Sequence, residues 1–290
     1  MPSYLVTGAR GQLGQCFKSV ANEFPECTLF FASRFEVDIT QPQTLKSYFE
    51  NQPFDGIINC AGYTQVDQAE KETSEANKIN VEGVQNLIDF AEKKSLTLIH
   101  FSTDFVFDGN KMGSYFEEDA TNPLSVYGKS KLAGEAVLAK SKCQNVCFRV
   151  SWLFSPFGKN FVKTILKFSQ TKKEINVVDD QYGKPTYGID LAKAILANLN
   201  HPGLFKYNTY HFAQGPETNW FGFAQKIVEI SGNDCEVKPI LSSAYPALAK
   251  RPMNSVLDTQ RMEKNLSLNS RNWEDALLDC IKSIKNNEEF

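Results

Sequence analysis

Tyr127 and Lys131 have the residue types and the spacing of a proton-transfer pair. Residues four apart share one face of a helix, so both side chains can reach the same ligand. A free tyrosine has a pKa near ~10 and is a poor acid at neutral pH. A neighbouring ammonium stabilises the phenolate and lowers that pKa, so such a tyrosine can give a proton to a carbonyl oxygen. We therefore predict that Tyr127 and Lys131 are catalytic residues of a carbonyl-reducing enzyme.

A polar segment, Ser102-Thr103-Asp104, follows the apolar run of residues 96–101. At the end of a strand, the Thr103 hydroxyl can hold the same carbonyl oxygen that receives the proton. We predict Thr103 as a third catalytic residue, Asp104 as a substrate contact and Ser102 as a cofactor contact. The four-residue spacing of tyrosine and lysine is common by itself, and Thr103 and a glycine-rich turn make it specific.

That turn spans residues 8–14 and reads Gly-x-x-Gly-x-x-Gly between an apolar run and a helical pattern. Glycines let the backbone approach a pyrophosphate closely, and the following helix supplies free N–H groups and positive partial charge. We expect a dinucleotide site here. The predicted contacts are Gly8, Arg10, Gly11, Gln12, Leu13 and Gly14.

The residues after the second predicted strand indicate which dinucleotide binds. NAD sites commonly place an acid there for the ribose hydroxyls, whereas this chain has Ser33 and Arg34. A hydroxyl and a guanidinium suit a 2′-phosphate, and Arg10 can add a second positive charge. NADPH is therefore expected, with NADH possible. Asp38 and Ile39 follow and could contact the adenine edge.

Small residues also follow the third predicted strand, in the order Ala61-Gly62-Tyr63-Thr64. Small side chains at the carboxyl end of a strand leave space for a flat ligand in the crevice of an α/β sheet. We therefore predict that these four residues contact the cofactor.

Alternating apolar runs and amphipathic stretches predict the elements that position these residues. Strands are expected at 4–6, 28–32, 56–59, 96–101 and 146–150, and helices at 13–23, 40–49 with Thr40 as N-cap, 77–94 and 125–139. This rhythm is typical of an α/β, Rossmann-type doubly wound parallel sheet. We expect an NADP(H)-binding domain over residues 1–155.

The rhythm weakens after residue 155. Helices are expected at 161–169, 190–199, 221–231 and 273–285, and short strands at 175–178, 207–212 and 236–239. We expect residues 156–290 to form mainly a smaller, interwoven α/β substrate-binding lobe, with some segments returning to the first domain. In this half, Lys184 and Arg251 could meet a nucleotide diphosphate, since arginine suits phosphate contact.

The composition is that of a globular protein, with 42% hydrophobic and 22% charged residues. The net charge of −3 and the absence of basic runs give no sign of a nucleic-acid partner. No apolar run approaches the roughly 20 residues of a membrane helix. Seven scattered cysteines without a Cys-x-x-Cys pair indicate reduced thiols. No signal peptide is apparent, so we expect a cytoplasmic protein without a membrane partner.

Over nearly its whole length, the chain resembles the extended short-chain dehydrogenase/reductase family, and within it the dTDP-4-dehydrorhamnose reductases. The resemblance is carried by the glycine turn and by residues 61–70, 102–109, 123–135, 149–154, 179–186 and 251–252. It implies reduction of the C4 ketone of dTDP-4-dehydro-β-L-rhamnose, a nucleotide sugar. It also implies that Tyr127 is the proton donor, that Lys131 binds the nicotinamide ribose and that Trp152 lies against the substrate.

Two departures from the family pattern have consequences. Phe105 stands where the family often has tyrosine, so a contact hydroxyl is missing. Some members carry a glutamate shortly after the third glycine, used in a magnesium-bridged dimer, whereas this chain has Gln15 and Cys16. We therefore predict no metal and leave a monomer and a homodimer open.

Two other functions remain alternatives. One is a nucleotide-sugar epimerase or dehydratase, although related dehydratases have glutamate at the position of Phe105, and phenylalanine cannot move protons. The other is a non-catalytic NADP-binding regulator like the regulatory subunit of methionine adenosyltransferase. Intact Thr103, Tyr127 and Lys131 favour the enzyme.

Overall fold

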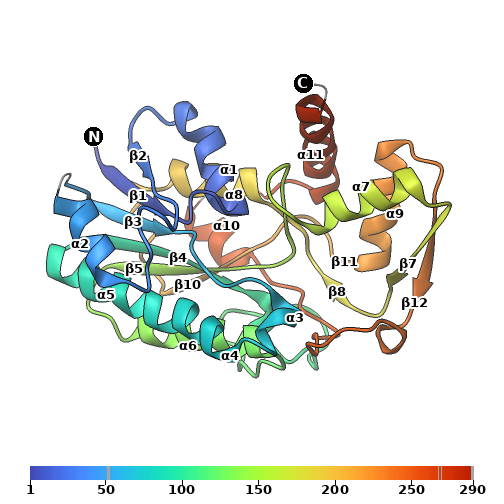
Figure 1. Ribbon diagram of the computed structural model, residues 1–290, viewed down its shortest axis with the longest axis horizontal. Coiled ribbons are helices and arrows are strands. Elements are labelled where there is room, and N and C mark those ends of the chain that lie inside the picture. Colours follow the sequence, from blue (N-terminus) through green and yellow to red (C-terminus); the bar gives the residue numbers. More distant parts are fainter. Residues whose placement is uncertain (51–52, 267, 269, 289–290) are drawn as a thin grey trace.

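Six parallel strands form the main sheet of the protein, in the spatial order β10-β5-β4-β3-β1-β2 (Figure 1). The computed structural model describes residues 1–50, 53–266, 268 and 270–288, so the last two residues of the predicted second lobe lie outside it. The strands are β1 (Ser3–Thr7), β2 (Thr28–Phe31), β3 (Gly56–Asn59), β4 (Thr97–Thr103), β5 (Asn145–Val150) and β10 (Thr209–Phe212). The predicted α/β fold with a doubly wound parallel sheet is confirmed.

Both faces of this sheet are covered by helices because successive strand residues are apolar on both sides. Tyr4 and Val6 face one core, and Leu5 between them faces the other. The first face packs on α1 (Gln12–Val20), α8 (Gly188–Ala197) and α10 (Gln260–Leu266). The second packs on α2 (Pro42–Glu50), α5 (Gly83–Lys94) and α6 (Val126–Ala139). A short 3₁₀ turn, Ala21–Glu23, continues α1.

The strand order reverses between β1 and β3, which pair directly with Thr7 opposite Asn59. From β1 the chain steps outward to β2, and it then returns past β1 to β3, β4 and β5. The loops after β1 and β3 therefore diverge and open a crevice at the carboxyl edge of the sheet. In open α/β sheets this is where ligands bind.

Two predicted helices differ from the structure. Helix α2 begins at Pro42, and Thr40 is not its N-cap, because the Thr40 hydroxyl donates to Asp38 Oδ1 instead (2.8 Å). Proline is favoured in the first helical turn, where its missing N–H costs nothing. The helix predicted over 77–94 begins earlier, with α4 (Thr73–Asn77), and passes through a π-helical segment, Lys78–Glu82, before α5. A four-residue helix, α3 (Val66–Ala69), precedes α4.

The described residues within 151–288 build a second layer beside the carboxyl edge of the sheet and also complete the sheet itself. Strand β10 and helices α8 and α10 return to the main sheet, whereas β7 (Glu174–Val178) and β12 (Glu236–Ile240) pair apart from it (Figure 1). Helices α7 (Phe161–Thr171), α9 (Trp220–Ser231) and α11 (Trp273–Glu288) surround a second core. Two short pairs join these parts: β6 (Leu153–Phe154) with β9 (Thr186–Tyr187), and β8 (Tyr182–Gly183) with β11 (Thr218–Asn219).

Within the described part of the chain, no helix has both the length and the apolar composition to span a membrane.

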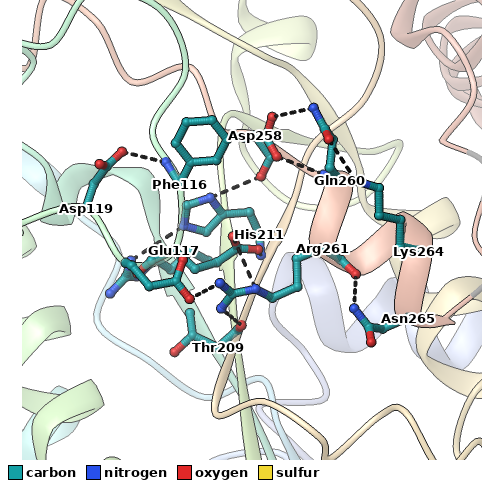
Figure 2. Close-up of polar contacts among 12 residues, drawn as sticks. Phe116, Glu117, Asp119, Thr209, His211, Asp258, Gln260, Arg261, Lys264 and Asn265 are labelled. Atoms are coloured by element: carbon teal, nitrogen blue, oxygen red, sulfur yellow. Dashed lines mark hydrogen bonds and ion pairs between the residues drawn. The ribbon is translucent and has the colours of Figure 1, made fainter.

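A buried polar network joins β5, β10, α6 and the start of α10. Figure 2 shows the part of this network around Glu117, His211 and Arg261. Arg149 on β5 pairs with Glu135 on α6 at 2.7 Å, and both side chains are less than 10% exposed. The guanidinium of Arg149 also donates, through Nη1, to the Glu117 carbonyl oxygen at 3.2 Å. Glu117 in turn accepts from the His211 backbone N–H at 3.1 Å and pairs with Arg261 at 3.6 Å. The network therefore ties the helix that carries Tyr127 and Lys131 to the last strand of the sheet.

His211 in this network should make the protein less stable in mild acid. Its Nδ1 lies 3.2 Å from the Asp258 carbonyl oxygen, which only accepts, so Nδ1 carries the proton and Nε2 faces Arg149. Burial, and then the charge of Arg149, lower the pKa of His211 to about 3. An unfolded histidine takes up a proton near pH ~6.5, so stability is present above that pH and is lost as the pH falls towards the folded pKa.

Between pH 7 and pH 5, we expect the free energy of unfolding of the wild-type protein to fall by about 2 kcal/mol more than that of His211→Gln. The measurement is the free energy of unfolding in urea at the two pH values, for both proteins. Equal losses in the variant and the wild type would show that His211 is not neutral in the folded state.

Candidate active site

A cleft of about 1240 Å³ lies along the carboxyl edge of the main sheet. One wall consists of the loops that follow β1, β3 and β4 together with the start of α6, and the other consists of β7, α7, α9 and residues 242–253. The second wall includes a 3₁₀ turn, Ser242–Ala244, whose first residue donates through its N–H and hydroxyl to Asp180. The cleft thus lies between the sheet and the later part of the chain.

The glycine turn has the close packing that a dinucleotide cradle requires. Gly8 has a φ of +62°, which favours glycine, and a Cβ there would lie 2.7 Å from the Ala61 nitrogen. A Cβ on Gly14 would lie 2.4 Å from the Gly8 carbonyl oxygen. Gly11 caps the N-terminus of α1 without a side-chain hydrogen bond, so the first N–H groups of this nine-residue helix stay available. The turn therefore fits a pyrophosphate group.

The predicted adenosine contacts lie beyond the cleft, at the end of β2. The Ser33 hydroxyl donates to Glu36 at 2.8 Å, and Arg34 pairs with Asp38 at 3.1 Å. The Ile39 side chain is buried in the core, and its carbonyl accepts from Asn86 at 2.8 Å. These residues are close in space to the glycine turn, because the Ala9 N–H donates to the Ala32 carbonyl oxygen at 3.1 Å.

Thr103, Tyr127 and Lys131 all line the cleft. Burial raises the pKa of Tyr127 to about 12, a hydrogen bond with Thr103 opposes that shift, and the charge of Asp104 adds to it. The Lys131 ammonium donates to the Phe101 carbonyl oxygen at 2.6 Å, and burial lowers its pKa. A Cβ on Gly62 would lie 3.8 Å from Lys131 Nζ, so the lysine faces the loop after β3.

The expectation that Lys131 lowers the pKa of Tyr127 is wrong for this structure. Burial is the dominant effect on Tyr127, and the Lys131 ammonium is turned to the backbone at Phe101. The tyrosine therefore keeps its proton at neutral pH, which is the state that a proton donor needs.

Asp104 is a second titratable group in the cleft. Burial raises the pKa of its carboxyl group to about 6, and hydrogen bonds, including one from the Thr103 hydroxyl at 3.0 Å, oppose the shift. Phe105 follows it in a 3₁₀ turn, Asp104–Val106, with its ring centroid 6.0 Å from that of Tyr127. An apolar ring thus lies against the tyrosine at the position of the dehydratase glutamate.

The first turn of α6 is held in place by three contacts that fix the direction of Tyr127. The Ser125 hydroxyl accepts from the Gly128 N–H at 3.1 Å as an N-cap. Glu70 accepts from the Val126 N–H at 2.8 Å, which suits the positive end of the helix dipole. A Cβ on Gly128 would lie 2.3 Å from the Phe105 carbonyl oxygen, so the helix packs directly on the loop after β4.

Asn80, which was not among the predicted residues, connects the loop after β3 to the helix that carries Tyr127 and Lys131. Its side chain accepts from the Tyr63 N–H at 2.9 Å and donates to Ser130 Oγ at 2.9 Å. The π-helical segment turns this side chain inward, and such segments are frequent at functional sites. A signal was present, because Asn80 stands in the helical spacing of the buried residues Val84 and Leu87.

Trp152 lines the cleft in a strained backbone conformation, with a φ of +46°. Its ring stacks on Trp220 with centroids 3.6 Å apart, and a Cβ on Gly183 would lie 2.5 Å from it. Non-glycine residues with positive φ cost energy and concentrate at ligand sites. The aromatic wall therefore has two tryptophans, and Trp220 was not among the predicted residues.

Of the two cations predicted for the diphosphate, only Arg251 lines the cleft among the described residues. Arg251 pairs with Asp67 at 2.7 Å, and the same carboxylate accepts from the N–H groups of Leu248 and Ala249. Residues 248–251 are therefore tied to α3, the short helix that follows β3. Lys184 contributes its backbone carbonyl to Ser151 Oγ, and its side chain does not line the cleft.

The predicted residues thus divide into two groups. The group that lines the cleft consists of Gly11, Gln12, Leu13, Ala61, Gly62, Thr64, Ser102, Thr103, Asp104, Tyr127, Lys131, Trp152 and Arg251. The group outside its lining consists of Gly8, Arg10, Gly14, Ser33, Arg34, Asp38, Ile39, Tyr63 and Lys184. Tyr63 is buried, and its hydroxyl donates to Glu72 at 2.8 Å.

A glycine turn at the switch point of a doubly wound sheet, facing a Tyr–Lys helix across one cleft, places the protein among the extended short-chain dehydrogenases/reductases. Residues 3–286 match the family model described as RmlD substrate binding domain. The dTDP-4-dehydrorhamnose reductase of Aggregatibacter actinomycetemcomitans is 38% identical over 96% of this chain and 97% of its own. That of Sinorhizobium fredii is 36% identical over 93% of this chain and 94% of its own.

A crystal structure of dTDP-4-dehydrorhamnose reductase from Bacillus anthracis, in complex with NADP, superposes with a TM-score of 0.92. It is 33% identical and covers 98% of this chain and all of the other. The chain belongs to the dTDP-4-dehydrorhamnose reductase family.

Proposed function

We propose that this protein reduces the C4 ketone of dTDP-4-dehydro-β-L-rhamnose to dTDP-β-L-rhamnose with NADPH. It is an NAD(P)H-dependent oxidoreductase of dTDP-rhamnose biosynthesis, as its full-length relatives are dTDP-4-dehydrorhamnose reductases. The observation that supports the proposal is that Thr103, Tyr127 and Lys131 line the same cleft as the glycine turn. We propose that it works in the cytoplasm, as a monomer or homodimer, without nucleic-acid, membrane or metal partners.

The cofactor fits the residues present, because a Cβ at Gly8 or Gly14 would fill the close approach at the turn. When bound, NADPH supplies the hydride for the ketone carbon. The cofactor would be held by residues of the proposed NADP(H)-binding domain, 1–155. These are residues 8–14, 33–34, 38–39 and 61–64, with Ser102. NADH remains possible in the same cradle.

Residues of this protein would bind and protonate the oxygen of the ketone. Thr103 holds that oxygen through its hydroxyl, and Tyr127, protonated at neutral pH, gives it a proton. Lys131 lies on the side of Gly62, where it would bind the nicotinamide ribose. The balance is an alcohol on the sugar and a phenolate on Tyr127, which solvent protons then neutralise.

The sugar and its diphosphate would lie between the two walls of the cleft. Asp104, which follows Thr103, and Trp152 line the cleft and would contact the sugar. Arg251 also lines it and offers a guanidinium, which suits a phosphate. Lys184 is a weaker candidate for the diphosphate, because its side chain does not line the cleft. The substrate lobe over residues 156–290 stays part of this proposal, with β10, α8 and α10 belonging to the main sheet.

The deciding experiment supplies the ketone. We expect the purified protein to oxidise NADPH only when given a 4-keto-6-deoxy nucleotide sugar made in situ from dTDP-glucose, with dTDP-glucose itself as the control. The measurement is the loss of reduced-nicotinamide absorbance together with the dTDP-β-L-rhamnose formed. Bound cofactor without turnover would contradict the enzyme and favour the non-catalytic regulator. Turnover to an epimer without net NADPH loss would favour the epimerase.

A further inference from the structure

At the end of β2, facing the glycine turn, one carboxylate oxygen occupies a site built for an anion. Glu36 Oε2 accepts from the Ser33 backbone N–H at 2.7 Å and from the Ser33 hydroxyl at 2.8 Å. Ser33 is 4% exposed, so its two donors are fixed in position. Glu36 itself is exposed to solvent. The carboxylate is therefore held by a buried pair of donors, while its own backbone lies on the surface.

The charges of two cations, Arg10 and Lys18, also act on this carboxylate. The Ser33 hydrogen bonds lower the pKa of Glu36, and the charges of Arg10 and Lys18 lower it further, so the group is an anion at neutral pH. The Arg10 guanidinium stands over the Phe35 ring, 5.3 Å from its centroid, which holds it above this end of the strand. Backbone N–H, hydroxyl and guanidinium groups together are the donors that phosphate prefers.

Arg34 points away from this place. Its guanidinium pairs with Asp38 at 3.1 Å and with Glu75 at 3.5 Å. Arg10, on the glycine turn, is therefore the arginine that acts on the Glu36 carboxylate. The donors at the site come from both elements that a dinucleotide would touch, the turn after β1 and the end of β2.

We propose that the Glu36 carboxylate occupies the place of the 2′-phosphate of NADPH and thereby sets the preference of this protein between NADPH and NADH. The inference rests on the proposed function, because it assigns a residue to the cofactor of that reaction. The 2′-phosphate must displace Glu36 from Ser33 before it can use the same donors, which weakens NADPH binding. NADH leaves the carboxylate in place, where its second oxygen can accept from the ribose hydroxyls.

The same hydrogen bonds could serve only to close a turn. The Glu36 N–H donates to the Ser33 carbonyl oxygen at 3.0 Å, so the two residues bond reciprocally, as in a capping box. On that interpretation, loss of the carboxylate changes the stability of the turn and weakens both cofactors alike. The two interpretations therefore differ in the ratio of the two affinities.

The experiment measures dissociation constants of NADP⁺ and NAD⁺ by calorimetry for the wild type and for Glu36→Gln. We expect the preference for NADP⁺ over NAD⁺ to rise by about tenfold or more in Glu36→Gln, because a competing charge-assisted contact is removed. Adenosine 2′,5′-bisphosphate against 5′-AMP, which lack the nicotinamide, should show the same change. Glu26→Gln removes an equal charge before the other end of β2 and should leave the ratio unchanged.

An unchanged or smaller NADP⁺ preference in Glu36→Gln, in a protein with wild-type circular dichroism, overturns the proposal. Glu36→Ala gives a second variant in which no side-chain oxygen can return to Ser33, and it should behave like Glu36→Gln. Failure of the wild-type protein to bind either dinucleotide would instead contradict the cofactor of the proposed function, and this proposal with it.

Discussion

Replacing Tyr127 with phenylalanine should lower kcat by roughly 100- to 10,000-fold, the range of a positioned proton donor. The variant keeps the ring against Phe105 and loses only the hydroxyl that gives the proton. Binding of NADP⁺ should change little, because the glycine turn and the end of β2 are untouched. The measurement is steady-state turnover with the in situ nucleotide sugar, together with NADP⁺ binding by calorimetry.

Tyr207→Phe is the matched control for this prediction. Tyr207 packs on Tyr210 and beneath Arg261, outside the lining of the cleft, so its hydroxyl should be dispensable for turnover. A Tyr127→Phe enzyme with a near wild-type rate would contradict the assigned role and move the proton donor to another group. Asp104 would be the next candidate, since burial raises its pKa to about 6.

Replacing Arg149 with methionine should destabilise the fold by about 3–5 kcal/mol, since it leaves a buried carboxylate without its partner. Glu135 lies on α6, four residues after Lys131, and its side chain is 9% exposed in the pair with Arg149. Arg149 also donates to the Glu117 carbonyl oxygen, and it stands over the Phe107 ring with its guanidinium 5.2 Å from the centroid. The measurement is the free energy of unfolding in urea.

The double variant Arg149→Met/Glu135→Leu should recover most of that loss, because a buried ion pair can often be exchanged for apolar residues. Lys173→Met is the control. Lys173 pairs with Asp234 at 2.8 Å, but both side chains are almost fully exposed, so the free energy of unfolding should hardly change. A double variant as unstable as Arg149→Met alone would mean that shape, and not the buried charge, causes the loss.

The main elements of the fold were predictable because their signals are local. Apolar runs marked β1, β3, β4 and β5, and a helical spacing placed Tyr127 and Lys131 on one face of α6. The errors were also local in kind. Thr40 was assigned as a cap although Pro42 starts the helix, and the π-helical segment around Asn80 has no distinct sequence pattern.

The electrostatics of the site could not be predicted in the same way. A lysine four residues from a tyrosine suggested a lowered tyrosine pKa, whereas burial raises the pKa of Tyr127 to about 12. Burial depends on everything that packs around a group, and spacing along one helix carries no information about it. For the same reason, the ion pair of Arg34 with Glu75, 41 residues later in the chain, could not be predicted.

By itself, the sequence determined the class of chemistry: a glycine turn after a strand, a hydroxyl at a strand end, and a tyrosine and a lysine on one helix face. Only the tertiary structure decided how these meet. It placed Gly8 against Ala61, Arg251 against Asp67 and the Glu36 carboxylate on Ser33. Local spacings set the faces and ends of single elements, whereas contacts between distant segments, and the charges around them, depend on the packing of the whole chain.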